Sequence, residues 1–235
     1  MDAPRSLGVG PLAQESAPLR RRLVATLRGL IANGTLPAGR RLIETELCAE
    51  LRVSRTVLRE ALRELEADGL LVAGARGLSV AVLSRAEAQN IYAVRRALEG
   101  LIARQFCERA PEIALAALAL AHRRLIGAYE ADDLAGLLDA KLAFYRALCQ
   151  GAENLVVLEL VERLNARISL LRARSLAQPA RKNASLAEIG GLVEALIARD
   201  ADAAEALAAR HIANAAAAAL GGLPDITPLH PETAQ

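Results

Sequence analysis

The stretch Val53-Ser-Arg-Thr-Val-Leu-Arg-Glu-Ala-Leu-Arg-Glu-Leu-Glu-Ala-Asp-Gly-Leu70 predicts one helix with two opposed faces. At about 100° per residue, apolar side chains fall in one arc, and cationic and hydroxyl side chains fall opposite them. Ser54 stands where an N-cap hydroxyl accepts an amide of the first turn. One face is expected to pack on a core, and the other suits a phosphate backbone and the acceptor edges of guanine. The apolar set is Leu58, Ala61, Leu62 and Leu65, and the polar set is Arg55, Thr56, Arg59 and Arg63.

The flanking sequence decides between this interpretation and an ordinary surface helix with solvated arginines. Upstream, apolar residues repeat at helical spacing from Pro18 to Asn33-Gly34, a typical helix end. After a tight connection, a short helix is expected from Thr45 to about Leu51, and a brief turn joins it to the stretch above. A short helix, a tight turn and a helix with a basic exposed face form a helix-turn-helix.

Downstream, two short apolar runs around a glycine-rich turn predict a β-hairpin. The expected strands are residues 70–72 and 80–82, and the turn is Gly74-Ala-Arg-Gly77. Beside a helix-turn-helix, such a hairpin is a wing. Its Arg76 would reach a narrow minor groove, and Gly77 would let the backbone approach DNA closely. The alternative is a turn that contributes only to solubility.

Composition and charge favour a helical protein with a basic N-terminal part. Hydrophobic residues make up 53% of the chain but aromatic residues only 2%, so the core must be aliphatic. No apolar run approaches the roughly 20 residues of a membrane span, and no signal sequence opens the chain, so a cytoplasmic protein is expected. Residues 19–83 hold 11 Lys and Arg against 7 Asp and Glu, whereas residues 84–235 hold 17 against 18. Cys48, Cys107 and Cys149 form no C-x-x-C pair and are interpreted as reduced core residues.

The N-terminal part resembles the winged-helix domain of the GntR family of bacterial transcription regulators, over about Leu19 to Leu83. The resemblance implies that Arg55, Thr56 and Arg59 read DNA, with Ser54 at the helix cap and Arg76-Gly77 at the wing. Two positions depart from the family pattern: Thr45 stands where many relatives have an arginine, and Val57 replaces a proline or threonine. The motifs that carry the resemblance are Leu36-Pro-Ala-Gly-Arg-Arg-Leu42, Glu46-Leu47, Val53-Ser-Arg-Thr-Val-Leu-Arg-Glu-Ala-Leu62 and Asp68-Gly-Leu70.

From Ser84 onward the pattern is helical. Ser84-Arg-Ala-Glu87 is a capping box that opens the first helix. Six to seven helices with short links predict a compact antiparallel bundle, so the whole chain is expected to be mainly α. The later helices are expected at 112–129, 132–150, 153–177, 185–199 and 201–220.

This second part resembles the effector-binding domain of the FadR-type, or FCD, branch of the GntR family. The resemblance rests on Ile91-Tyr-Ala-Val-Arg-Arg-Ala-Leu-Glu99, on Phe144-Tyr-Arg-Ala-Leu148 and on Asn154. It divides the chain into a flexible leader (1–17), a winged helix-turn-helix domain (18–83), an all-helical effector-binding and dimerisation domain (84–221) and a tail (222–235).

In many members of that branch, an Asp, a His four residues later and two further His hold a divalent metal inside the bundle. Here the matching positions are Lys141, Tyr145, Ile189 and His211, so three of the four ligands are absent. A lysine offers only hydrogen-bond donors and a positive charge, which would repel a divalent cation. No metal or other cofactor is expected.

We hypothesise that Lys141 supplies the positive charge that the metal supplies in relatives. The resemblance associates Arg95 with the carboxylate of an effector. The alternative is that Arg95 pairs with Glu99 across one helical turn and that Lys141 points to solvent. The sequence leaves both open. The predicted donor-rich lining for a small organic anion is Arg95, Lys141, Tyr145, His211 and Asn214.

The sequence therefore predicts a DNA-binding transcription regulator, expected to be a repressor. It would bind a short palindromic operator as a homodimer, and a small carboxylate effector would modulate that binding. The alternative is a non-catalytic helical interaction scaffold with a vestigial DNA-binding domain. An enzyme is not expected, because the three His and the serines show no convergent acid, base or nucleophile partners.

Overall fold

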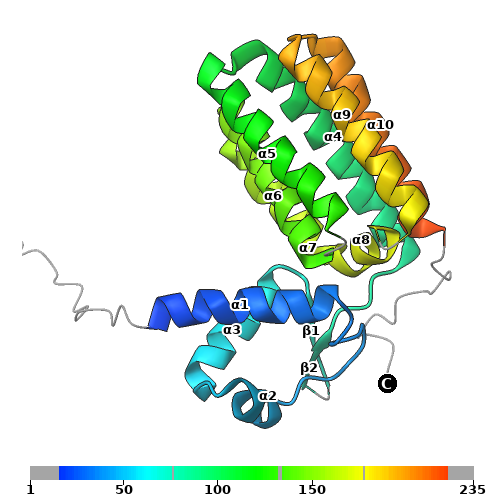
Figure 1. The fold of residues 1–235 in the computed structure, drawn as a ribbon. Coiled ribbons are helices and arrows are strands. Elements are labelled where there is room, and N and C mark those ends of the chain that lie inside the picture. The colour runs from blue at the N-terminus through cyan, green and yellow to red at the C-terminus, as the bar shows by residue number, and fades with distance from the viewer. Residues whose placement is uncertain (1–15, 76, 132–133, 177, 222–235) are drawn as a thin grey trace, which may run out of the picture.

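The structure, a computed structural model, describes residues 16–75, 77–131, 134–176 and 178–221. The chain is mainly helical, and Figure 1 shows a small N-terminal domain beneath a bundle of longer helices. The predicted leader and tail fall, for residues 1–15 and 222–235, outside the described residues. The elements of the N-terminal domain are α1 (Ser16–Ala32), α2 (Glu44–Leu51), α3 (Arg55–Ala67), β1 (Leu71–Gly74) and β2 (Gly77–Val80).

Helix α3 is fixed by the face that the sequence predicted to be apolar. Leu58, Ala61 and Leu65 are each 0% exposed, in a core that they share with α1 and β1. The Ser54 hydroxyl accepts a hydrogen bond from the amide of Val57 at 3.3 Å, which confirms the predicted N-cap. With this face buried, the opposite face of α3 points to solvent.

The wing is an antiparallel pair whose strands lie closer to the turn than predicted. Leu71 pairs with Val80 and Gly74 with Gly77, so the predicted return strand at 80–82 was placed too late. The reason is local: Gly77 has a φ of +104°, which lets the chain reverse and pair at once. Residues 39–42 run along β2, where the Gly39 amide donates to the Val80 carbonyl at 2.9 Å.

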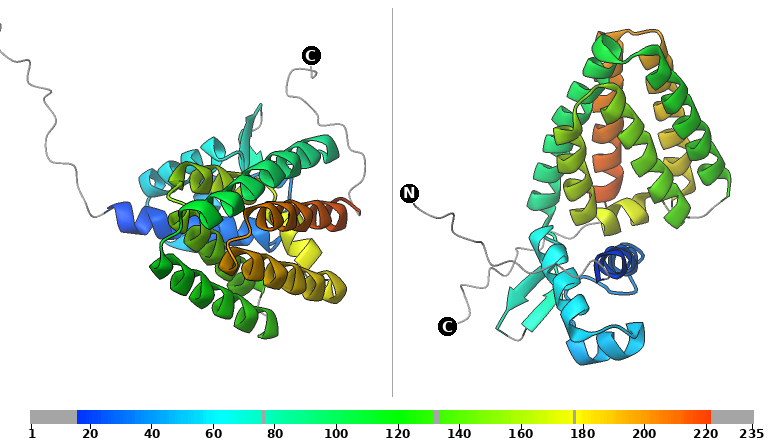
Figure 2. Two further views of the ribbon diagram at one scale, coloured as in Figure 1. Left: turned by 90° about the horizontal axis from the view of Figure 1, so that it is seen from above. Right: turned by 90° about the vertical axis from the view of Figure 1, so that its left-hand side faces the viewer.

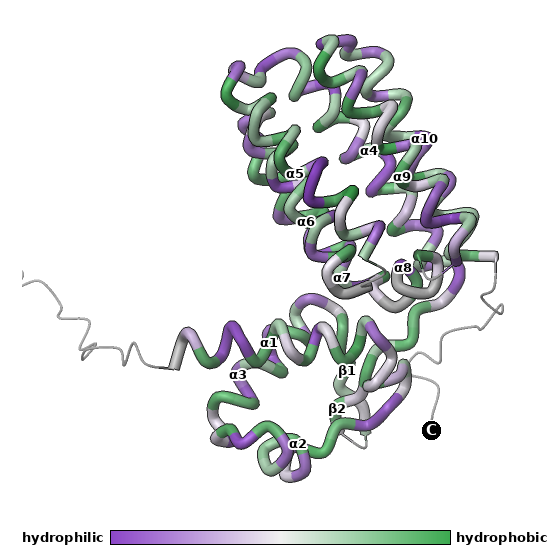
Figure 3. Tube along the Cα trace, viewed as in Figure 1, coloured by the Kyte–Doolittle hydropathy of each residue, from purple (hydrophilic) through white to green (hydrophobic). Residues whose placement is uncertain are grey.

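In the described part of the chain, seven helices form the bundle, and green and purple segments alternate along them in Figure 3 as expected of amphipathic helices. Ser84 caps the first of them by accepting the Glu87 amide at 3.1 Å. The predicted single helix at 153–177 is wrong: the chain breaks at Ile168, which is 0% exposed and anchors a turn between two helices. The helix expected at 185 begins earlier, at Pro179, because proline suits the first helical turn. The helices are α4 (Arg85–Arg109), α5 (Glu112–Glu130), α6 (Leu134–Gly151), α7 (Leu155–Arg167), α8 (Ser169–Leu176), α9 (Pro179–Ile197) and α10 (Ala201–Leu220).

The short helix α8 closes the end of the bundle that faces the N-terminal domain. Figures 1 and 2 show α1 lying directly beneath it, and the two helices are in contact. Nearby, Arg167 at the end of α7 pairs with Glu87 of α4. Its side chain also lies against Gly69, where an added Cβ would be 3.0 Å from the Arg167 Nε. The end of the bundle is thus in direct contact with the domain that carries α3.

Candidate nucleic-acid interface and anion site

The outer face of α3 gathers the four polar side chains that the sequence placed together. Arg55, Thr56, Arg59 and Arg63 are all exposed, and the first two lie in the first turn of the helix. Free amides make that end of a helix positive, which adds to the arginine charges. Arg59 also pairs with Glu44 at the start of α2, Nε to Oε2 2.8 Å, while its side chain stays 61% exposed. The result is a cationic face on a helix whose opposite face is packed in the core.

The wing adds a second cationic element beside α3. Arg76 lies outside the described residues, so its predicted role stays a prediction. Sequence reasoning missed Arg41, which is exposed and forms a backbone bridge with Ser79 of β2. Its Nε lies 3.9 Å from where a Cβ would stand at Gly77. The signal was available in the motif at residues 36–42, which contains this arginine.

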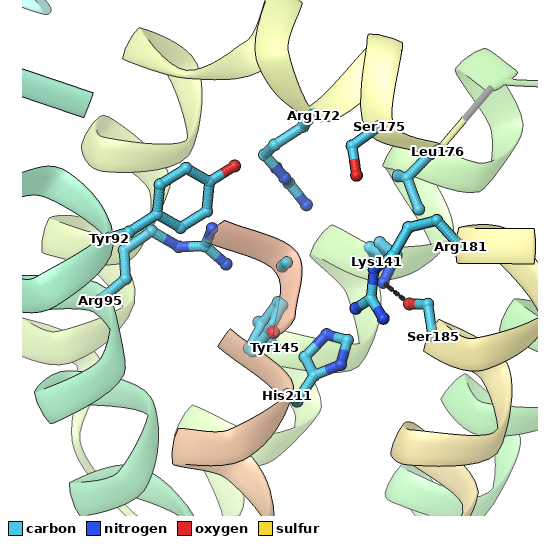
Figure 4. Close-up of a pocket in the computed structure, with 11 residues that line it drawn as sticks. Tyr92, Arg95, Lys141, Tyr145, Arg172, Ser175, Leu176, Arg181, Ser185 and His211 are labelled. Atoms are coloured by element: carbon cyan, nitrogen blue, oxygen red, sulfur yellow. Dashed lines mark hydrogen bonds between the residues drawn. The ribbon is translucent and has the colours of Figure 1, made fainter. Parts of the chain in front are cut away.

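A second candidate site is a cavity of about 30 Å³ inside the bundle. Figure 4 shows side chains from α4, α6, α8, α9 and α10 converging on it. Four predicted residues lie together in its wall, namely Arg95, Lys141, Tyr145 and His211. The other residues of the wall are Tyr92, Arg172, Ser175, Leu176, Arg181, Ser185 and Ala215.

Arg95 combines the two predictions made for it. It lines the cavity, and it also pairs with Glu99 one helical turn away, Nη2 to Oε1 2.7 Å. Both side chains are buried, at 3% and 2% exposure. The guanidinium lies 5.4 Å from the ring centre of Tyr92, within the range of a cation–π contact.

Lys141 does not point to solvent, so that alternative is wrong. The residue is 4% exposed, and its Nζ donates to the Ser185 Oγ at 3.0 Å. The ammonium lies 5.6 Å from the ring centre of Tyr129. Burial lowers the pKa of Lys141 well below its ordinary value, and the guanidiniums of Arg172 and Arg181 lower it further. The surroundings of Lys141 therefore disfavour its charged form.

A carboxylate that the sequence analysis missed, Glu188 of α9, organises one wall of the cavity. Arg181 donates to both of its oxygens, at 2.7 and 2.8 Å, and His211 contacts it through Nδ1 at 2.6 Å. Burial lowers the pKa of His211 to about 4. Hydrogen bonds from His211 and Arg181 hold the pKa of Glu188 well below its ordinary value, although burial opposes them. The carboxylate is therefore ionised and the imidazole neutral near pH 7.

Asn214 is the predicted site residue that the structure does not place in the cavity wall. Its amide donates to Glu188 Oε1 at 2.8 Å on the exposed side of that carboxylate. The prediction rested on helical spacing from His211, but the two side chains reach Glu188 from different sides. Asn214 thus supports the wall without lining the cavity.

Arg172 is the least expected member of the wall. It lies on α8, which the sequence analysis merged into a longer helix, so no periodicity pointed to its orientation. Among the described residues its side chain makes no hydrogen bond or ion pair, and it alone lines both this cavity and the groove between α1 and the bundle. Arg172 thus connects the interior of the bundle with the domain junction.

The residues at the family's metal-binding positions do not fit a metal. Lys141 and Tyr145 lie where an Asp and a His would stand, and Ile189 is a buried apolar residue at 2% exposure. Only His211 remains, and its Nδ1 is engaged by Glu188. Over the part of the chain that the structure describes, no cluster of three or more His, Cys, Asp or Glu side chains could hold a metal ion.

A winged helix-turn-helix with exposed arginines, joined to a helical bundle around a cationic cavity, defines a two-domain architecture that known proteins share. The profile of the bacterial regulatory proteins of the gntR family matches residues 19–80, and that of the FCD domain matches residues 90–214. The chain belongs to the GntR family, in the branch that carries an FCD domain.

Named relatives agree with this family. A "Probable D-xylose utilization operon transcriptional repressor" of Paenarthrobacter nicotinovorans is 30% identical over 78% of this chain and 80% of that protein. The "Uncharacterized HTH-type transcriptional regulator YdhC" of Bacillus subtilis is 41% identical, over 37% of this chain and 39% of its own length. A solved structure of a putative GntR regulator from Rhodococcus sp. RHA1 has a TM-score of 0.74 at 26% identity, covering 88% of this chain and all of that one. The relatives are thus transcription regulators.

Across the described ranges, none of the helices is long and apolar enough to span a bilayer.

Proposed function

We propose that this protein is a DNA-binding transcription regulator, acting as a repressor, whose operator binding is modulated by a small organic acid held in the bundle cavity. The observation that carries the DNA-binding part is the exposed row of Arg55, Thr56, Arg59 and Arg63 on a helix whose other face is buried. Such a rigid cationic helix suits the major groove. Relatives named as regulators and repressors support the same assignment.

The surface of the bundle supports a homodimer. Helices α4 and α7 lie side by side and antiparallel, because Asn154 contacts Gln105 at one end and Arg167 pairs with Glu87 at the other. Apolar side chains are exposed along both, and apolar patches of this kind are typical of protein contacts. A two-fold dimer would read a short palindromic operator. The exposed residues are Val94 and Leu101 on α4 and Leu155, Val156 and Leu160 on α7.

The cavity supports an anionic effector. Its wall carries four cationic residues, Arg95, Lys141, Arg172 and Arg181, against the two carboxylates that contact them, Glu99 and Glu188. An anion bound to Arg172 would act on α8, which touches α1 of the DNA-binding domain. Binding would then favour one placement of that domain, which is the condition for coupling between the two sites.

The site contains no catalytic arrangement that would suggest an enzyme. Ser185 accepts hydrogen bonds from Lys141 and from the Tyr129 hydroxyl, at 3.0 and 2.6 Å. These hydrogen bonds orient Lys141 and Tyr129, but they do not activate Ser185 as a nucleophile. We place the protein in the cytoplasm, where chromosomal DNA is accessible.

The test is selection of genomic DNA fragments by the purified protein at near-physiological salt. The Arg55→Ala/Arg59→Ala variant is run in parallel, with Arg123→Ala/Arg124→Ala on the exposed face of α5 as the matched control. We expect the wild type and the control to enrich one short palindrome and the α3 variant to enrich none. If the wild type enriches no site, with or without added acids, the regulator assignment fails and the interaction scaffold becomes the better hypothesis.

A further inference from the structure

The cavity wall holds two cationic side chains, Lys141 and Arg172, that no carboxylate of the described chain pairs with. Arg95 is paired with Glu99, and Arg181 is paired with Glu188 through both of its Nη atoms. In contrast, the Lys141 ammonium donates only to the neutral hydroxyl of Ser185. The Arg172 side chain has no ion pair or hydrogen bond within the described chain. Lys141 is buried and Arg172 is partly buried, and cations in such places are normally paired, so these two side chains are the groups with which an anionic ligand would pair.

The remaining nitrogen of His211 is a hydrogen-bond acceptor. An ionised carboxylate only accepts, so the contact of Glu188 with Nδ1 requires the hydrogen on Nδ1. The lowered pKa of His211 means that the ring is neutral, so Nε2 carries no hydrogen. Nothing else in the described part of the structure donates to Nε2, and His211 lines the cavity. Most polar groups of the wall are hydrogen-bond donors, so this acceptor atom is the one to which a ligand hydroxyl would donate.

The volume of the cavity limits the size of the ligand. About 30 Å³ holds roughly two water molecules. A long chain or a nucleotide would require the helices to separate. A small acid larger than two water molecules requires part of the wall to move, and the Arg172 side chain can move because no hydrogen bond or ion pair of the described chain holds it.

We propose that the effector is a compact dianion that also carries a hydroxyl group, such as a short hydroxy-dicarboxylate, bound with its negative charges at Lys141 and Arg172 and its hydroxyl on Nε2 of His211. This inference rests on the assignment of the cavity as the effector site. It narrows the class, because it excludes simple monocarboxylates and acyl thioesters. A phosphorylated polyol has the same charge and hydroxyl chemistry and is a second source of such a ligand.

The electrostatics of the cavity wall are consistent with this occupant. The pKa of Lys141 is lowered mainly by burial and then by the neighbouring guanidiniums. The charge on Arg172 is opposed by burial and by Arg95. A dianion between the two groups would relieve both effects, since an opposite charge favours the charged form of each.

The first experiment measures binding of small acids to the DNA-free full chain by calorimetry at pH 7.5. The probes are both enantiomers of malate, succinate, lactate, propionate and sn-glycerol 3-phosphate. We expect malate or glycerol 3-phosphate to bind about 10- to 100-fold more tightly than lactate, the range for one charge-assisted hydrogen bond. We expect succinate, which lacks the hydroxyl, to bind about 3- to 10-fold more weakly than malate. Which of malate and glycerol 3-phosphate binds better identifies the source of the dianion.

Variants test the two charges separately. Arg172→Gln removes a side chain that no partner holds, so we expect the fold to persist and the preference for malate over lactate to fall to about twofold or less. Lys141→Met should weaken the binding of all the acids. Arg124→Gln, an exposed arginine of α5, is the matched control and should bind as the wild type does.

Two outcomes overturn the proposal. The first is equal binding of lactate and malate by the wild type. The second is the absence of binding by every dianion in the panel. Neither outcome affects the palindrome selection, which is carried out separately, so a failed effector class is distinguishable from a failed assignment as a regulator. Equal binding of succinate and malate would remove the hydroxyl from the proposal.

Discussion

The outer face of α3 and the cavity of the bundle both gather arginines, but in opposite environments. On α3, Arg55 and Arg63 are in water, which solvates their charge without help from the fold. In the bundle, Arg95 is 2% exposed and is held by a carboxylate just as deeply buried. We therefore expect the same residue type to contribute to binding in one region and to stability in the other.

The comparison also shows how a ligand site can be recognised within a network of charges. Arg95 and Arg181 have carboxylate partners, as buried cations that serve structure do. Lys141 and Arg172 have no carboxylate partner, and in our proposal the bound anion supplies it. Arg55 and Arg63 on α3 await an external partner too, but in solvent. The lack of a carboxylate partner in the cavity wall is thus the feature that separates the proposed effector contacts from the supporting residues.

The largest effect is expected where a buried pair is broken. Arg95→Met leaves Glu99 buried without its counter-charge, so we expect the free energy of unfolding to fall by about 3–5 kcal/mol. Removing both charges in Arg95→Met/Glu99→Met should restore much of that loss. Chemical denaturation of the three proteins measures this. A single variant as stable as the wild type would contradict the structural role of the pair.

On α3 the same kind of truncation should affect binding alone. Arg55→Ala is expected to cost about 1–3 kcal/mol of specific DNA binding, because the arginine is exposed on the face that we propose contacts DNA. Its free energy of unfolding should stay within about 0.5 kcal/mol of the wild type. Fluorescence anisotropy with the selected operator and denaturation of the same sample separate the two quantities. Loss of stability without loss of affinity would mean that Arg55 contributes to the fold and not to DNA binding.

The sequence alone predicted the α3 face because helical periodicity is a local property. The spacing of Leu58, Ala61 and Leu65 places them in one arc whatever the rest of the chain does, and all three are buried. The wing was found for the same reason, although its strands were placed about two residues too far from the turn. There the conformation of Gly77, and not the apolar pattern, sets the register.

The cavity could be predicted only in part, because it depends on how distant helices pack. Resemblance to the family pointed to Arg95, Lys141, Tyr145 and His211, and the structure brings these together. It could not show that the chain breaks at Ile168, and without that break Arg172 has no predictable orientation. Arg181, Ser185 and Glu188 were missed for a related reason: their helix begins six residues earlier than the apolar pattern suggested.

A titration should distinguish the buried wall from the exposed face. The pKa of His211 is about 4 in the folded protein, mainly because of burial, against about 6.5 when exposed. Below pH 6.5 His211 binds a proton in the unfolded chain, whereas in the folded protein it stays neutral until the pH approaches 4. Stability is therefore fully present above pH 6.5 and is lost as the pH falls toward 4. We expect a loss on the order of 1–2 kcal/mol between pH 7 and pH 5.

The comparison for this titration is His211→Gln, whose amide can still donate to Glu188. Glu188 stays ionised over this range because its pKa lies well below it, and His122 is present in both proteins. The variant should therefore lose less stability on acidification than the wild type does. Identical melting temperatures at every pH after subtracting the offset at pH 7 would show that His211 is not the group responsible.

The smallest effect concerns the pair of Arg59 with Glu44, the point where the exposed face includes a protein partner. The pair is solvent-exposed, so Glu44→Gln should change stability by less than about 1 kcal/mol. The same change frees the Arg59 guanidinium and removes a negative charge beside the DNA-binding face. We expect operator affinity to rise by about 0.2–1 kcal/mol, and the rise to shrink at high salt because exposed charges are screened.

Anisotropy titrations at two salt concentrations measure this change in operator affinity, with Glu50→Gln, an exposed acid of the same helix, as the control. If Glu44→Gln instead weakens binding while Glu50→Gln does not, the pair positions Arg59 for DNA, and this part of the face is held by a carboxylate as Arg95 is.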